Sequence, residues 1–125
     1  MDDLIFYSMI ICHIIADYNL QGWLASAKCK DWWQQNAPDK LYRNDYWVAL
    51  FMHSLFWSFM IILPLIIYRF TSIDSWFVLT LGINTAIHAA VDNLKANEKK
   101  INLITDQIIH MFQIMITFAV ITVSF

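Results

Sequence analysis

Four long apolar runs constrain the fold of this chain more than any other feature. They cover about residues 4–25, 47–68, 75–95 and 101–124. Each is close to the roughly 20 residues that an α-helix needs to cross a hydrocarbon core at about 1.5 Å per residue. The chain is 59% hydrophobic and 14% charged, whereas soluble domains average about 45–50% and about 25%. We therefore predict an all-α polytopic membrane protein: a four-transmembrane-helix bundle that forms one domain over residues 1–125.

The connections between the runs predict the arrangement and orientation of the helices. The segments at about 69–74 and 95–100 are short, so consecutive helices should be antiparallel neighbours. The loop 26–46 is longer, and its aromatic and basic residues suit a position at the lipid headgroups. The loops 26–46 and 95–100 hold all the Lys and Arg residues except Arg69. The positive-inside rule therefore places these loops in the cytoplasm and both termini outside the inner or plasma membrane.

Every predicted helix carries a histidine, and three of them also carry an aspartate. Such residues are costly inside a membrane and commonly mark functional sites. Three His/Asp pairs are spaced four residues apart, which places both members of a pair on one helix face. Counting inward from the predicted cytoplasmic ends puts all these groups in one layer about two helical turns thick. The layer consists of His13, Asp17, His53, His88, Asp92, Asp106 and His110.

Four imidazoles and three carboxylates at one depth are typical of a divalent metal site. Neutral histidine nitrogen and aspartate oxygen suit Zn, Mn or Fe, and the number of ligands allows one or two ions. A bound cation would also compensate carboxylates that are otherwise expensive to bury. A spare carboxylate is a candidate general base, and a nearby lysine is a candidate binder of phosphate or another anionic group. The candidate catalytic residues are Asp17, Asp92, Asp106, Lys28 and Lys95, and the candidate residues supporting the ligands are Gln21 and Gln107.

The ordered set of polar residues resembles an uncharacterised family. The pattern is His13-x-x-x-Asp17-Tyr18-x-Leu20-Gln21, Lys28, His53, His88-x-x-x-Asp92-x-x-Lys95 and Asp106-Gln107-x-x-His110. It looks like that of a domain-of-unknown-function family of small four-helix membrane proteins from bacteria and phages. The resemblance covers nearly the whole chain. It implies a polytopic membrane protein in which these positions belong together, and it brings no established activity. The His/Asp layout is also loosely similar to membrane-bound metal-dependent hydrolases.

We interpret the pattern as a membrane-embedded metal-dependent hydrolase that acts on a lipid headgroup or an anionic, phosphate-containing small molecule. One alternative is a small proton- or cation-coupled transporter or channel that uses the His/Asp cluster as a relay. A second is a non-catalytic phage or bacterial membrane factor that binds a host protein through the Trp-rich loop. Polar contacts between membrane helices average only about 0.6 kcal/mol, less than the roughly 2.5–3.5 kcal/mol cost of inserting an aspartate, so structural support alone explains the cluster poorly.

The lipid bilayer is the one partner that the composition predicts. A net charge of −2 argues against nucleic acid as a partner. A homo-oligomer remains open at the level of the sequence.

Overall fold

The computed structural model describes residues 1–69 and 75–124, and every regular element in these two ranges is helical. The all-α prediction is thereby confirmed. The predicted short loop at about 69–74 falls almost entirely outside the described residues. The elements are α1 (Asp2–Ile14), the π-helix η1 (Ile15–Asn19), α2 (Leu24–Ala27), α3 (Lys30–Asn36), the 3-10 helix η2 (Lys40–Tyr42), α4 (Asp45–Arg69), α5 (Ser75–Ala96) and α6 (Leu103–Ser124).

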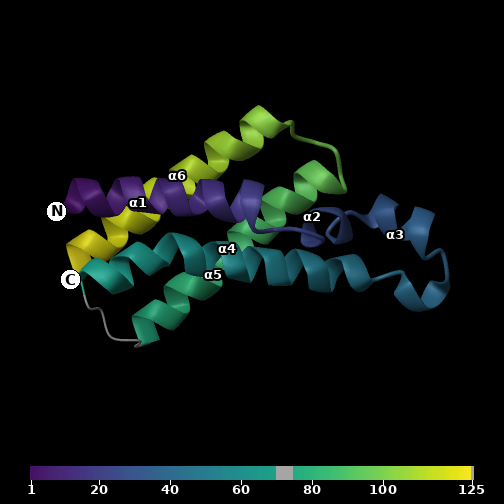
Figure 1. The fold of residues 1–125 in the computed structure, drawn as a ribbon, viewed down its shortest axis with the longest axis horizontal. Helices are drawn as coiled ribbons and strands as arrows, with labels where there is room; N and C mark the ends of the chain where they lie inside the picture. The colour runs from purple at the N-terminus through teal and green to yellow at the C-terminus, as the bar shows by residue number, and fades with distance from the viewer. Residues whose placement is uncertain (70–74, 125) are drawn as a thin grey trace.

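The four longest helices form a bundle (Figure 1). Helix α4 packs against α1 and α5, and α6 packs against α5 and α1. Consecutive long helices run in alternating directions, so the start of α1 and the end of α6 lie at one end of the bundle. The connection from α5 to α6 and the arm that carries α3 lie toward the other end, as Figure 1 shows.

Two helical segments among the described residues are long and apolar enough to cross a membrane. They are Lys40–Tyr68, which covers α4 except for its last residue, and Leu103–Val123 in α6. Helix α5 has 22 residues, but buried polar side chains such as Asn84 and Asp92 lower its mean hydropathy. Helix α1 has 13 residues before the π-helix begins.

The first apolar run does not form one helix over 4–25. Helical structure continues from α1 through η1 and ends at Asn19, and Gly22 follows with a φ of +49°. Glycine adopts a positive φ without steric cost, so the chain can change direction there. The side-chain amide of Gln21 donates to the backbone carbonyl of Asp17, which satisfies an acceptor near the helix end. The following residues then form the short α2 instead of extending the first helix.

Tryptophan side chains hold the arm formed by α2 and α3 together. Trp23, Trp32 and Trp33 meet edge to face, with ring centroids 5.0–6.0 Å apart. The indole N–H of Trp33 also donates to the carbonyl of Ala27 at 2.6 Å. These contacts fix α2 against α3 and so determine where Lys28, between the two helices, points.

The interior of the bundle changes character along its length. The half near the start of α1 contains most of the buried apolar side chains, whereas the half toward the α3 arm contains the buried His, Asp and Lys side chains. Along α1, Ile5 and Met9 come before His13, and along α4, Trp57 and Ile61 come after His53. The apolar cluster consists of Ile5, Met9, Ala16, Trp57, Ile61, Ile62, Leu65, Ile114 and Ile121. The polar half contains the candidate site.

Candidate metal centre

The structure brings all seven predicted ligands into one buried cluster. They come from α1, η1, α4, α5 and α6, and none is more than 7% exposed. They are His13, Asp17, His53, His88, Asp92, Asp106 and His110. The helical rise predicted that these seven side chains lie at one depth, and in the structure they are close together. They differ in their hydrogen-bond and ion-pair partners.

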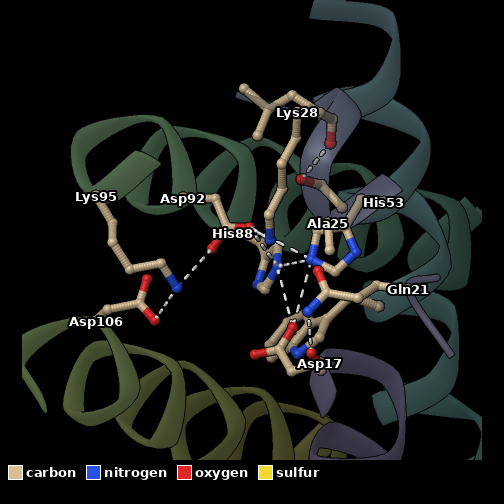
Figure 2. Close-up of polar contacts among 12 residues, drawn as sticks. Asp17, Gln21, Ala25, Lys28, His53, His88, Asp92, Lys95 and Asp106 are labelled. Atoms are coloured by element: carbon tan, nitrogen blue, oxygen red, sulfur yellow. Dashed lines mark hydrogen bonds and ion pairs between the residues drawn. The ribbon is translucent and has the colours of Figure 1, made fainter. Parts of the chain in front are cut away.

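A pair of imidazoles lies at the middle of the cluster. The Nε2 atoms of His53 and His88 are 3.2 Å apart. Asp17 places its Oδ1 atom 3.4 Å from the first nitrogen and 3.8 Å from the second. Asp92 places its Oδ2 atom at 3.3 Å and 3.7 Å from the same two nitrogens. Figure 2 shows the two carboxylates on different sides of the imidazole pair.

This arrangement fits a bound cation. Two unprotonated ring nitrogens repel each other at 3.2 Å, so either one carries a proton or both face a positive charge. A tetrahedral ion with bonds of about 2.0–2.1 Å separates its ligand atoms by about 3.3–3.4 Å. Two of the three separations within Asp17, His53 and His88, at 3.2 and 3.4 Å, are close to that value, and the third is 3.8 Å. The Oδ1 atom of Asp17 is buried and accepts no hydrogen bond from the described residues, so it is free to bind a cation.

The buried His and Asp side chains form two groups that could hold a metal ion. Within each group the ligand atoms lie within 4.8 Å of one another. The first group is Asp17, His53 and His88, and the second is His88, Asp92 and His110. Because both groups contain His88, they are overlapping positions within one centre.

Aromatic stacking sets the orientation of two of these imidazoles. The ring of Trp57 stacks on His88 with centroids 4.1 Å apart, and His88 stacks on His110 at the same distance. The Nε2 atoms of His53, His88 and His110 all face carboxylates. Their Nδ1 atoms have no hydrogen-bond partner among the described residues. The same nitrogen of each ring is thus directed toward the centre.

His13 is bonded differently from the other histidines. The indole N–H of Trp57 donates to its Nδ1 atom at 2.8 Å, and its Nε2 atom lies 3.1 Å from Oε1 of Gln107. Indole can only donate, so Nδ1 of His13 must accept, and the ring proton resides on Nε2 and is donated to Gln107. Both nitrogens are occupied by protein groups. His13 therefore orients Gln107, and neither of the two metal-binding groups includes it.

Asp106 and His110 form the side of the centre nearest α6. Nε2 of His110 lies 3.4 Å from Oδ1 of Asp106 and 3.4 Å from Oδ1 of Asp92. Gln107 donates from Nε2 to Oδ2 of Asp106 at 2.9 Å and approaches Oδ2 of Asp17 at 3.5 Å. Gln107 thus connects two carboxylates of the cluster. Gln21 bonds instead to the backbone of η1.

The two predicted phosphate-binding lysines are ion-paired with carboxylates. Lys28 is only 6% exposed, and its Nζ atom lies 2.7 Å from Oδ2 of Asp92. Nζ of Lys95 lies 2.6 Å from Oδ2 of Asp106 and 3.8 Å from Oδ1 of Asp92. With neutral imidazoles, three carboxylates and two ammonium groups leave one negative charge uncompensated. Burial makes an uncompensated charge costly, so the centre needs a further proton or cation.

Two residues that the sequence analysis did not single out support the centre. Trp57 donates a hydrogen bond to His13 and stacks on His88. It lies four residues after His53 and therefore on the same helix face, a spacing from which its place near the cluster could have been predicted. Asn97 anchors the segment that delivers Lys28: its side chain donates to the carbonyl of Lys28 and accepts from the amide of Lys30. No local pattern in the sequence indicates that second role.

The comparisons with known proteins identify the family of this chain. A family model described as "Protein of unknown function (DUF3307)" matches residues 5–125. The match covers nearly the whole chain, including all the residues of the centre, so the chain belongs to this family. Neither the curated proteins nor the solved structures include a match.

Proposed function

Since membership of this family assigns no activity, we propose from the geometry that the chain is a membrane-embedded, metal-dependent hydrolase. The observation that carries the proposal is the pair of Nε2 atoms of His53 and His88, 3.2 Å apart and flanked by two buried carboxylates. With neutral imidazoles the arrangement has one net negative charge, which a divalent cation would compensate. Nitrogen and oxygen ligands in such a set suit Zn, Mn or Fe.

The residues divide into ligands and groups that handle protons and substrate. Asp17, His53 and His88 would hold the ion, which would lower the pKa of a bound water and supply the nucleophile. Asp92 lies on the other side of the imidazole pair and is placed to accept a proton from that water. With a divalent ion the centre has a net positive charge, which favours an anionic substrate such as a phosphate ester. Lys28 and Lys95 are paired with Asp92 and Asp106, and each would have to share its charge between that carboxylate and the substrate's phosphate.

The distribution of exposed residues supports a four-span arrangement. The exposed side chains of α5 include Trp76, Leu79 and Ile83, while its polar residues face the interior. The low hydropathy of α5 therefore comes from its buried face. At 1.5 Å per residue α5 is about 33 Å long, and α1 with η1 is about 27 Å long, close to the thickness of a hydrocarbon core. The basic loops would lie in the cytoplasm with the centre in the cytoplasmic half.

A relay for protons or cations is the second candidate, and one observation favours it. A further polar layer lies between α5 and α6, where Gln113 and Thr117 donate to Oδ1 of Asn84 at 2.9 and 3.0 Å. The Oε1 atom of Gln113 is buried without a hydrogen-bond partner among the described residues. This layer lies on α5 and α6 beyond His88 and His110, on the side away from the basic loops.

Elemental analysis of the purified protein in detergent tests the proposal. We expect stoichiometric divalent metal, its loss in His88→Ala, and chelator-sensitive hydrolysis of a phosphodiester or phosphomonoester. His13→Gln is the comparison variant: it alters a buried histidine outside the two metal-binding groups and should keep the metal, although with a lower affinity than the wild type. Folded, metal-free wild-type protein would contradict the proposal, and proton or cation flux through reconstituted liposomes would support the relay instead.

A further inference from the structure

A pocket on the arm forms a polar site outside the metal centre. It has a volume of about 330 Å³ and is built from α3, η2 and the residues that connect and follow them. The polar and aromatic side chains of its lining are Lys30, Trp33, Gln34, Asp39, Lys40 and Arg43. None of these residues belongs to the His/Asp cluster, and Figure 1 shows α3 near the far end of the arm. The pocket is therefore a separate candidate binding site.

Contacts within the arm hold the walls of this pocket in place. The indole N–H of Trp33 donates to the carbonyl of Ala27, and the ring of Trp33 stacks on Tyr42 with centroids 6.3 Å apart and an interplanar angle of 17°. Asp39 caps η2, because its Oδ1 atom accepts the backbone N–H of Leu41 at 2.8 Å. Stacking joins α3 to the end of η2, and the cap fixes the start of η2. The chain itself thus forms the pocket.

The basic side chains of the pocket differ from the other lysines in having no counter-ion. Lys30, Lys40 and Arg43 form no ion pair within residues 1–69 and 75–124. Among the described residues of the lining, Asp39 carries the one negative charge. Three positive charges and one negative charge give the lining a net charge of +2. The remaining lysines of the chain are all paired with carboxylates: Lys28, Lys95, Lys99 and Lys100.

We propose that this pocket binds the phosphate group of a phosphate monoester. Such a group has about −1.5 to −2 charges at neutral pH and three acceptor oxygens, which balances the net charge of the lining. The guanidinium of Arg43 can bind two of these oxygens at once, and the lysines act as point charges. A carboxylate or a phosphodiester has a single negative charge and would leave half of the positive charge uncompensated. The inference does not depend on the proposed metal chemistry.

The position of the arm allows two sources for this phosphate. In the proposed four-span arrangement, the arm lies at the cytoplasmic end of the bundle, as Figure 1 shows for α3. A soluble phosphate monoester would reach the pocket from the cytoplasm. Phosphatidic acid would present the same group from the membrane surface, and Leu41, next to Lys40 and 75% exposed, would then contact the lipid. Both ligands share the monoester chemistry, so the experiment has to separate them.

Isothermal titration of the full chain in detergent tests the inference with two probes. Glycerol 3-phosphate represents the soluble source, and short-chain phosphatidic acid in the same detergent represents the lipid source. Short-chain phosphatidylglycerol, a phosphodiester, is the control for the charge of the ligand. Saturable binding of glycerol 3-phosphate would assign the soluble source. Saturable binding of phosphatidic acid alone would assign the lipid source, and both results support a monoester site.

Two pairs of exposed variants show whether binding occurs in the pocket. Arg43→Gln and Lys100→Gln each remove one positive charge, inside and outside the pocket respectively. We expect Arg43→Gln to bind the probe about fivefold more weakly and Lys100→Gln to bind it like the wild type. Asp39→Asn keeps the oxygen that caps η2 and should bind about twofold more tightly. Its control is Glu98→Gln, which removes one negative charge outside the pocket and should have no effect.

Three results would overturn the inference. The first is the absence of saturable binding for both monoester probes. The second is an equal change of affinity within each pair of variants, which would show that overall surface charge attracts the anion. The third is equally tight binding of phosphatidylglycerol, which would show that the pocket does not select a doubly charged phosphate. Because all four substitutions lie outside the His/Asp cluster, phosphate binding at the metal centre would not reproduce the expected differences.

Discussion

The indole N–H of Trp57 donates to Nδ1 of His13 at 2.8 Å, and the same indole ring stacks on His88. One side chain thus fixes the tautomer of a supporting histidine and the plane of a candidate ligand. Hydrogen bonds that orient the groups around a metal change its affinity by about 10–100-fold when they are lost. The Trp57–His13 bond is therefore part of the centre, although neither atom faces the proposed ion.

Replacing Trp57 with Phe tests this relationship. The variant keeps an aromatic ring beside His88, removes the donor to His13 and leaves a small cavity where the rest of the buried indole was. We expect metal affinity to fall about tenfold, because Gln107 and the carboxylates it holds lose their fixed orientation. Competition with a chromophoric chelator measures the affinity. An affinity equal to that of the wild type, in a protein with unchanged far-UV circular dichroism, would show that the bond has no influence on the centre.

The two kinds of histidine should respond differently to substitution. His88→Ala removes the imidazole that both metal-binding groups share and should abolish stoichiometric metal binding, since each group then keeps only two of its three ligands. His13→Ala removes a supporting group and should weaken binding without abolishing it. Metal per chain, determined after gel filtration in detergent, separates the two results. Equal loss in both variants would mean that His13 is itself a ligand.

Lys28 should be important for stability because its partner is buried. Lys28→Met leaves Asp92 without its nearest positive charge, and removing one partner of a buried pair costs about 3–5 kcal/mol. We expect a lower midpoint in denaturant unfolding and partial recovery in the double variant Lys28→Met/Asp92→Asn. Lys99→Met is the control, because its pair with Asp31 is exposed and should contribute little. A Lys28→Met midpoint equal to that of the control would contradict the importance of this ion pair.

Cys29 offers a test of orientation with a defined pH dependence. Burial raises the pKa of the Cys29 thiol, so less of it is thiolate at neutral pH than for an exposed cysteine. In a Cys12→Ser background, labelling by a membrane-impermeant maleimide should be slow at neutral pH and should keep accelerating to higher pH than for the exposed control Lys40→Cys in a cysteine-free background. Labelling should occur only from the cytoplasmic side. Labelling from the outer side of intact cells would reverse the proposed topology.

The sequence was most informative where helical periodicity determines position. The i, i+4 spacing and the common depth correctly placed His88, Asp92 and their counterparts near one another, because an α-helix fixes both the face and the height of each residue. The sequence did not show where the first helix ends. Trp23 and Leu24 prolong the apolar run beyond Gly22, and only the backbone shows the π-helix and the positive φ that end the helix.

The sequence did not predict which side chains form ion pairs and hydrogen bonds with one another. Lys28 and Lys95 have the positions of topology-determining or anion-binding lysines, and their pairing with Asp92 and Asp106 depends on how α2 folds back and how α5 meets α6. His13 has the same local pattern as His88. What distinguishes it is the donor group of Trp57 on another helix, a contact that no spacing along one helix encodes.

The break at Gly22 also has a consequence for biogenesis. Lys28 lies on a separate short segment, and it emerges from the ribosome 64 residues before its partner Asp92. In the proposed four-span arrangement, we expect its ammonium group to stay hydrated at the membrane surface until α5 has been inserted. Packing of the arm formed by α2 and α3 against the bundle would then be a late step of assembly. A chain stopped before that step would contain an inserted α5 in which Asp92 has not yet paired with Lys28.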